Sequence, residues 1–128
     1  MREYERLQLF KEHLEALLVT SNEQRSIFFE DVPEKRLRKV LCSGSESEDL
    51  VLSIDHGHLN NAEKERLHSF SEFSSKQIGE KTYSIPLGKD PRRAAGLIEA
   101  VFTRIIRAPE DYIVEIRVEK QEDSDADF

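Results

Sequence analysis

The sequence predicts a two-layer α+β sandwich with three helices and about five short, mainly antiparallel strands, in the order α-β-β-β-α-β-α-β. Three observations predict this fold class. Apolar residues recur at helical spacing in three segments, and they alternate with polar residues in the short runs between those segments. The chain has 128 residues, of which 38% are hydrophobic and 35% charged. This composition fits a single domain with a modest core and a well-solvated surface.

The first helix is expected over residues 2–19, where apolar positions recur every three or four residues and charged residues fill the other side. The polar cluster at residues 20–22 ends this helix. Aromatic and β-branched residues at 27–29 then predict a first strand, because such residues favour extended backbone. Val32 and Pro33 close that strand.

Residues 36–42 and 50–55 form two further strand-like runs on either side of a polar segment, residues 43–49, which suits a hairpin loop. The second run alternates between apolar and more polar positions, so we expect one of its faces to be buried. The first run contains interspersed arginine and lysine residues. It is therefore expected at an edge of the sheet, where charge discourages pairing with other chains.

Asn60 and Glu63 have the spacing of a capping box and predict the start of a second helix, with Ala62, Leu67, Phe70 and Phe73 broadly on one side. Serine residues weaken its C-terminal end. A strand is expected next, over residues 82–87. Tyr83, Ile85 and Leu87 share one face of that strand, and Pro86 belongs near a strand end or at an edge.

The third helix is expected over residues 91–107, because Asp90 is a good N-cap, Pro91 a good first helical residue, and Pro109 follows the last periodic positions. Its apolar residues cover about half of the circumference, a face broad enough to pack on a sheet. Alternation over residues 112–118 predicts the last strand. The final strand, helix and strand could form a right-handed parallel crossover.

The net charge of −7 is unevenly distributed along the chain. Residues 119–128 contain five acids and one lysine, a charge of −4, which leaves −3 for residues 1–118. We therefore expect a single domain over residues 1–118 and an acidic, disordered tail over residues 119–128. Such a tail could fold back over basic residues of the third helix and compete with an acidic partner.

The N-terminal residues lack the apolar block of a secretory signal, and no stretch approaches the ~20 apolar residues that cross a bilayer. The sequence therefore predicts a soluble protein without membrane attachment. Cys42 is the single cysteine, which forbids an internal disulfide and fits a reducing compartment. We accordingly expect a cytoplasmic location.

His56 and His58 are the candidate metal ligands. On an extended backbone, residues two apart share a face at a separation of about 6.6 Å, close enough to converge on one ion. The nearest third candidate, His68, is expected on the solvent side of the second helix. The alternative is a polar turn with exposed histidines, since two imidazoles fall short of the usual ligand count.

Cys42 and His56 form the one thiol–imidazole pair to test for nucleophilic catalysis. The expected hairpin separates them by roughly 20 Å, so Cys42 is better explained as a small buried hydrophobic residue. No catalytic residue and no cofactor is assigned from the sequence.

A weak anion-binding site is expected where a strand meets the third helix, because helix N-termini carry free amide groups and a positive dipole end. Its candidate residues are Lys89, Arg92, Arg93 and Arg104. Pro91 removes one amide and an Asp90 cap would occupy another, so an ordinary helix start explains the same residues. Neither of the common glycine-rich nucleotide motifs is present.

Basic residues also gather on the third helix and over residues 35–39. Nucleic-acid binders concentrate lysine and arginine in this way, but they usually add stacking aromatics or a basic domain average. The sequence shows neither feature and does not favour nucleic acid as the partner. A solvated surface is the leading explanation of these charges.

The apolar stripe of the first helix has two interpretations. It can dock on the sheet as ordinary core, or it can form a seam with a protein partner or a second copy, because spacing does not distinguish the two. The candidate partner-binding residues are Tyr4, Leu7, Phe10, Leu14 and Leu17.

We therefore expect a non-enzymatic, protein-binding module of the adaptor or chaperone-like kind. Size, acidity, apolar helix stripes and the lack of a catalytic set favour it. Bacterial secretion chaperones are similar in size, charge and α+β character, an analogy at the level of the fold that rests on no shared motif. The alternatives are a small-ligand or anion-binding domain at residues 88–93 and a metal-dependent enzyme at His56 and His58.

Overall fold

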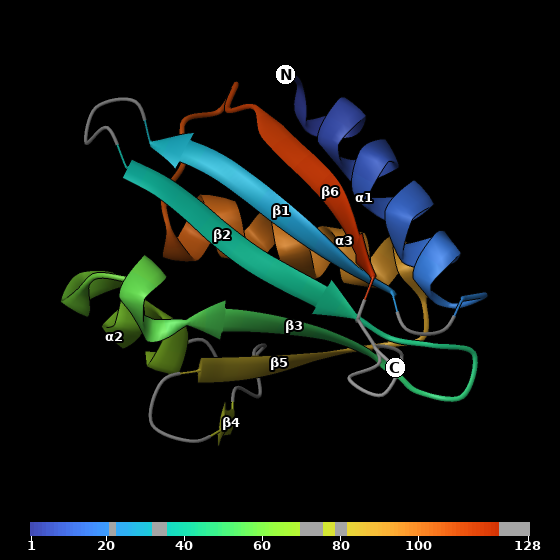
Figure 1. Ribbon diagram of the computed structural model, residues 1–128. Coiled ribbons are helices and arrows are strands. Elements are labelled where there is room, and N and C mark those ends of the chain that lie inside the picture. Colours follow the sequence, from blue (N-terminus) through green and yellow to red (C-terminus); the bar gives the residue numbers. More distant parts are fainter. Residues whose placement is uncertain (21–22, 32–35, 70–75, 79–81, 121–128) are drawn as a thin grey trace, which may run out of the picture.

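The computed structural model describes residues 1–20, 23–31, 36–69, 76–78 and 82–120. It confirms the α+β class and the expected order of helices and strands (Figure 1). The strands form one antiparallel sheet in the order β4-β5-β3-β2-β1-β6. The strands are β1 (Glu23–Asp31), β2 (Arg36–Ser43), β3 (Leu50–Asp55), β4 (Lys76–Ile78), β5 (Thr82–Gly88) and β6 (Val114–Lys120). The three-residue β4 is an addition to the five strands that the sequence predicts.

Helices α1 (Glu3–Leu17), α2 (Asn61–Ser69) and α3 (Pro91–Ala100) pack on the sheet, and α3 passes behind it in the view of Figure 1. The core lies between these two layers. Phe102 lies at its centre, with ring centroids 6.4 Å from Phe10 of α1, 6.1 Å from Phe29 of β1 and 5.4 Å from Tyr112. Stacked and edge-to-face aromatic contacts of this kind stabilise a core beyond the area they bury.

The hairpin of β2 and β3 forms as expected, but β2 is not an edge strand. It lies between β1 and β3, with Leu41 opposite Ser53 and Cys42 opposite Leu52. Its charges are accommodated on both faces of the sheet. Arg38 points into the protein and pairs with Glu63, whereas Lys39 lies over the ring of Phe28. An interior strand therefore tolerates Arg38 and Lys39 because each of these two has a partner.

The capping box at the start of α2 is confirmed. The Glu63 backbone N–H donates to Asn60 Oδ1 and the Asn60 N–H donates to Glu63 Oε1, each at 2.8 Å. Leu67 is buried, whereas Ala62 is exposed. The helix is described as far as Ser69, so the expected contributions of Phe70 and Phe73 lie outside the described residues.

The third helix begins and ends near the expected residues. Asp90 caps it by accepting from the Arg92 N–H at 3.0 Å, and Pro91 is its first residue. After Ala100 the chain widens into a π-helical turn, η2 (Val101–Ile105), and Arg107 then takes the left-handed conformation with φ of 59°. This widened turn ends the helix before Pro109.

The last two long strands are not neighbours. β5 and β6 run in the same direction but are separated by β3, β2 and β1, so α3 connects opposite sides of the sheet rather than adjacent parallel strands. Strand β6 extends to Lys120, two residues beyond the expected end of the domain at Val118. The acidic tail beyond Lys120 lies outside the described residues.

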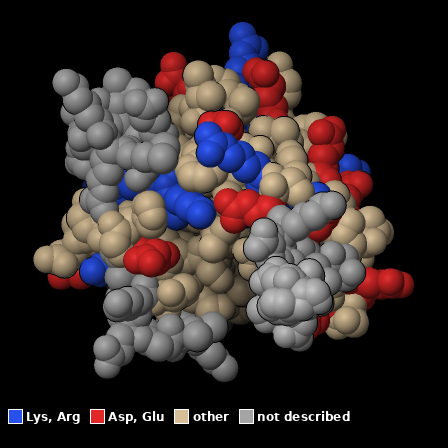
Figure 2. Space-filling view, in the orientation of Figure 1, with Lys and Arg blue, Asp and Glu red and all other residues tan. Residues whose placement is uncertain are grey.

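The sheet face that Figure 2 presents carries intermingled acidic and basic side chains across its middle. Phe28 on this face lies under two cations, Lys39 Nζ at 5.7 Å and Arg117 Cζ at 4.7 Å from its ring centroid. The long side chains cover the ring while their charged ends reach water.

Candidate protein-binding groove

Helices α1 and α3 pack against each other and leave a groove of about 300 Å³ between them. Tyr4, Leu7, Gln8 and Lys11 of α1 and Arg92, Ala95 and Gly96 of α3 line it. The residues from α1 share one side of that helix because they are three or four positions apart, and the same holds for α3. The groove therefore combines an apolar floor with basic and amide groups.

Small residues of α3 keep the groove open. Ala95 is buried, and Gly96 is exposed in the middle of the helix. A β-carbon added at Gly96 would meet nothing within 4 Å, so the space above the glycine is free. Glycine costs about 1 kcal/mol relative to alanine inside a helix, and nothing in the packing of α3 requires it at this position.

A buried ion pair fixes the two helices relative to each other. Arg6 of α1 and Glu99 of α3 are 1% and 6% exposed, and the guanidinium donates to both carboxylate oxygens, at 2.9 Å from Nε and 2.7 Å from Nη2. Arg6 Nη1 also donates to the backbone carbonyls of Met1 and Tyr112. A bidentate pair of this kind sets distance and orientation together.

Tyr112 completes this cluster from the segment before β6. Its hydroxyl donates to Glu99 Oε1, and its ring lies 3.9 Å from Arg6 Cζ. Burial raises the pKa of Tyr112, and the hydrogen bond to Glu99 raises it further. The hydrogen bond to Glu99 also raises the pKa of Arg6, although burial opposes this effect. The guanidinium of Arg6 is therefore charged and the phenol of Tyr112 neutral at neutral pH.

Two cations flank the apolar floor of the groove. Lys11 Nζ lies 3.3 Å from Glu15 Oε1, one turn further along α1, where both side chains are partly exposed. Arg92 is exposed, and its guanidinium forms no ion pair with any other residue of the described chain. The groove therefore presents positive charge beside apolar surface, on a protein whose overall charge is negative.

The structure divides the expected partner-binding stripe between the core and the groove. Phe10, Leu14 and Leu17 are at most 1% exposed within the chain itself, which fits the interpretation of the stripe as core. Tyr4 is 65% exposed and Leu7 half-buried, and these two residues line the groove. The part of the stripe that a partner can reach is therefore its N-terminal part.

The expected anion-binding residues do not all gather in one place. Lys89, Arg92 and Arg93 are exposed at the start of α3, and Lys89 Nζ lies 3.9 Å from Asp49 Oδ1. Arg104 lies in η2, roughly 18 Å further along the helix axis at 1.5 Å per residue. The Asp90 carboxylate accepts from the Arg92 N–H, so it already uses one amide of the first turn.

The backbone at the two candidate metal ligands is not extended. His56 and His58 belong to a 3-10 turn, η1 (His56–His58), rather than to an extended strand. A turn at these residues matches the alternative interpretation of the sequence, and the metal site, which depends on an extended backbone, stays a prediction. His58 Nδ1 accepts from the Lys39 N–H at 3.2 Å. The described residues contain no cluster of three or more side chains suited to a metal.

Other candidate groups have structural contacts. His68 is exposed as expected, but its Nε2 lies 3.1 Å from the hydroxyl oxygen of Tyr83 on β5. Cys42 is buried, and burial raises the pKa of its thiol to about 12. It is therefore a neutral thiol at physiological pH and acts as a small core residue.

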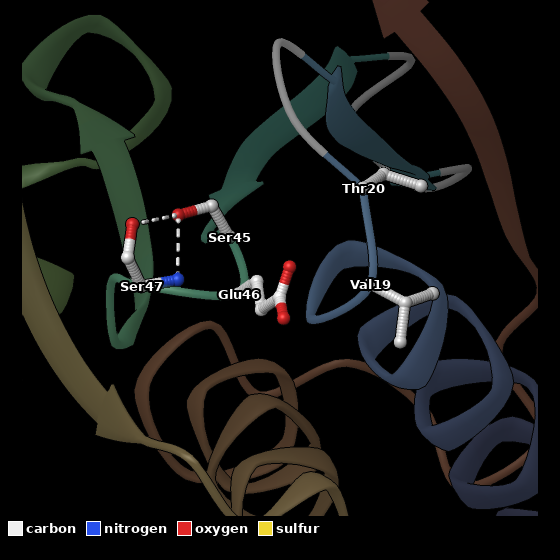
Figure 3. Close-up of a pocket in the computed structure, with 5 residues that line it drawn as sticks. All are labelled: Val19, Thr20, Ser45, Glu46 and Ser47. Atoms are coloured by element: carbon white, nitrogen blue, oxygen red, sulfur yellow. Dashed lines mark hydrogen bonds between the residues drawn. The ribbon is translucent and has the colours of Figure 1, made fainter.

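A second cavity, of about 510 Å³, lies between the end of α1 and the loop that joins β2 to β3 (Figure 3). Val19 and Thr20 line one side, and Ser45, Glu46 and Ser47 line the other. Ser45 Oγ accepts from the Ser47 N–H at 3.3 Å, and Glu46 points from the loop toward the end of α1. The described residues of its lining are more polar than those of the groove, and among them are one carboxylate and no cation.

The sequence contains a pattern that indicates the buried Arg6–Glu99 pair, although charged residues are expected at the surface. Arg6 precedes Phe10 by four residues and therefore lies on the buried stripe of α1. Glu99 follows Ala95 by four residues and precedes Phe102 by three. One base and one acid within the apolar stripes of two helices is the pattern of a buried ion pair. The groove residues Gln8, Lys11 and Gly96 carry no comparable signal.

None of the helices in the described part of the chain is long and apolar enough to cross a membrane. The chain was compared with models of known families, with curated proteins and with solved structures, and none of them matches it.

Proposed function

We propose that this protein is a non-enzymatic binding module, of the adaptor or chaperone-like kind, whose α1–α3 groove receives an amphipathic helical segment of a partner protein. The observation that carries the proposal is the composition of the groove. It has an apolar floor, an exposed tyrosine at one end and two cations, Lys11 and Arg92, at its rim. Grooves between helices commonly receive the apolar face of a partner helix.

Charge complementarity defines the chemistry of the partner segment. Arg92 forms no ion pair with another described residue, and Lys11 holds only an exposed contact with Glu15, which contributes little. A carboxylate brought beside these cations would gain an ion pair without breaking a buried one. The segment should therefore present apolar residues at i and i+4, flanked by aspartate or glutamate.

The residue types of the groove also fit a binding surface. Tyrosine and arginine are enriched among the residues that dominate binding energy at protein interfaces. Tyr4 and Arg92 contribute one of each, from different helices. The buried Arg6–Glu99 pair holds those helices in place, so the groove is formed before a partner arrives.

Selection of peptides on the intact protein tests this function. A display library of random 15-residue peptides is selected for binding to the full chain, with counter-selection against the Leu7→Glu variant, which places a charge on the apolar floor. We expect enriched sequences with helical apolar spacing and acidic flanks. A library that yields no binder, or one that yields basic or non-helical binders, would contradict the proposal.

The two neighbouring arginines of α3 provide a matched pair of variants. Arg92 lines the groove, whereas Arg93 is also exposed but is not among the residues that line it. For a selected acidic peptide, Arg92→Glu should weaken binding about tenfold or more, and Arg93→Glu much less, because only the first removes a contact at the site. Equal losses would show that the peptide responds to general charge.

A further inference from the structure

The two edges of the sheet differ in their capacity to accept another strand. At one edge β4 is three residues long, and the part of β5 beyond it contains Pro86, which has no N–H to donate. At the other edge β6 presents seven residues without proline or glycine (Figure 1). Within the described chain β6 pairs with β1 alone. Such an edge is a template for a strand of another molecule.

We propose that β6 pairs with β6 of a second copy of this chain, antiparallel and in a register centred on Ile116. Ile116 then faces its counterpart across a two-fold axis, and Val114 of each copy faces Val118 of the other. The pairing joins two six-stranded sheets into one continuous sheet. It uses no residue of the α1–α3 groove, so it goes beyond the proposed function.

Charge complementarity is the first argument for this register. Glu115 and Arg117 lie on the same face of β6, where both side chains are more than half exposed and Arg117 Nε donates to Glu115 Oε1 at 3.1 Å. A pairing centred on Ile116 places Glu115 of each copy opposite Arg117 of the other. The interface therefore contains two cross-strand pairs of opposite charge, which stabilise an antiparallel sheet.

Apolar complementarity is the second argument. Val114 and Ile116 point toward the helices and are buried or half-buried, but Val118 on the same side is 51% exposed. The proposed register brings Val118 of one copy against Val114 of the other. Three successive apolar pairs then line the helix-facing side of the interface, and the exposed valine becomes covered.

Two other registers that keep both helix layers on one side are less favourable. A pairing centred on Arg117 places Arg117 opposite Arg117 and Glu115 opposite Glu119, so like charges face each other. A pairing centred on Val118 places Ile116 opposite Lys120 and leaves Glu115 beyond the end of the partner strand. The register centred on Ile116 is therefore the one of these three that matches both charge and apolar surface.

Sedimentation equilibrium on the full chain, over a range of concentrations up to the millimolar level, tests the pairing. The wild type should approach twice the mass of the chain. Arg117→Glu and Glu115→Arg should each remain monomeric, because each places like charges opposite one another. Arg93→Glu, the same reversal away from β6, should leave the dimer unchanged. A monomeric wild type, or charge-reversal variants that still dimerise, would overturn the proposal.

Mixing experiments separate a lost interface from a damaged fold. The double variant Glu115→Arg/Arg117→Glu restores opposite charges and should dimerise again. An equimolar mixture of the two single variants should form a heterodimer, since one copy then carries two arginines and the other two glutamates at these positions. Failure of both the double variant and the mixture to associate would contradict the register.

Disulfide trapping reports the register directly. Paired residues of antiparallel strands have α-carbons about 4.5–5.5 Å apart, within the range that a disulfide spans. Ile116→Cys should therefore crosslink under mild oxidation, whereas Val118→Cys should not, because its counterpart lies roughly 13 Å away along the strand. The natural Cys42 is buried and does not interfere. Crosslinking through position 118 instead of 116 would overturn the proposed register.

Discussion

The buried ion pair between Arg6 and Glu99 should contribute strongly to the stability of the folded protein, because it joins α1 to α3. Removal of one partner leaves the other charged, buried and unpaired, which typically costs about 3–5 kcal/mol. We expect Arg6→Ala to lower the free energy of unfolding by about 3 kcal/mol or more and Glu99→Ala by a similar amount. Urea titration of each variant measures both losses.

A double-mutant cycle distinguishes this pair from two independent packing defects. In Arg6→Ala/Glu99→Ala no charge is left unpaired, so the combined loss should be smaller than the sum of the single losses by about 1–3 kcal/mol. Additive losses would mean that the two side chains do not interact in the folded protein.

His13 makes stability depend on pH. Its Nδ1 accepts from Arg25 Nε at 3.1 Å, and burial together with the Arg25 charge lowers its pKa below the ordinary 6.5, although Glu12 opposes the shift. The unfolded chain therefore takes up a proton at a higher pH than the folded protein does. The His13 contribution is complete above pH 6.5 and is lost as the pH falls toward the folded pKa.

The corresponding variant is His13→Gln, whose side-chain oxygen can still accept from Arg25 but does not titrate. Melting temperatures measured between pH 5 and pH 7.5 should fall less steeply on acidification for this variant than for the wild type. Identical slopes would assign the acid sensitivity to other groups.

At the scale of elements, substitution of two glycines by alanine should change the stability of the protein in opposite directions. Gly96 lies in the middle of α3 with free space around it, so Gly96→Ala should stabilise the protein by about 1 kcal/mol through helix propensity. Gly88 ends β5 with φ of +75°, so Gly88→Ala should destabilise it by about 1–2 kcal/mol. Thermal unfolding measures both changes.

Periodicity predicted the helices and strands because each of them buries one side. The apolar residues of that side recur at a regular spacing in the local sequence. Periodicity placed β2 wrongly because the pairing of Arg38 with Glu63 joins residues 25 positions apart, and no local pattern reports it. It left an extended pair and a polar turn open at His56 and His58, and the turn forms there, with Asp55 Oδ1 accepting from the Gly57 N–H at 2.8 Å.

At the scale of the molecule, the sequence alone does not predict that Tyr4, Leu7 and Arg92 form one groove. The sequence predicts Tyr4 and Leu7 as part of a partner seam and Arg92 as part of an anion site, as two separate hypotheses. Their meeting depends on how α1 packs against α3, which the Arg6–Glu99 contact fixes across 93 positions of sequence. The chemistry of each residue was therefore predictable, whereas their common location was not.

The α1–α3 groove and the β6 edge are separate surfaces of the molecule with different proposed roles. The groove lies between α1 and α3, and β6 is an edge strand of the sheet in the described part of the chain. A dimer joined through β6 would present two grooves in a single assembly. A partner with two acidic helical segments would then bind more tightly to wild type than to Arg117→Glu, whereas a single segment would bind both equally. Binding curves for a one-segment and a two-segment peptide measure this difference.

The most direct test of the binding groove is an amide NMR titration of the full chain with a selected acidic helical peptide. The account predicts that shift changes concentrate at Leu7, Lys11, Arg92, Ala95 and Gly96, and that Arg92→Glu weakens the binding measured in the same experiment. Shift changes centred on the cavity between Val19 and Ser45, or on the open face around Phe28, would contradict it.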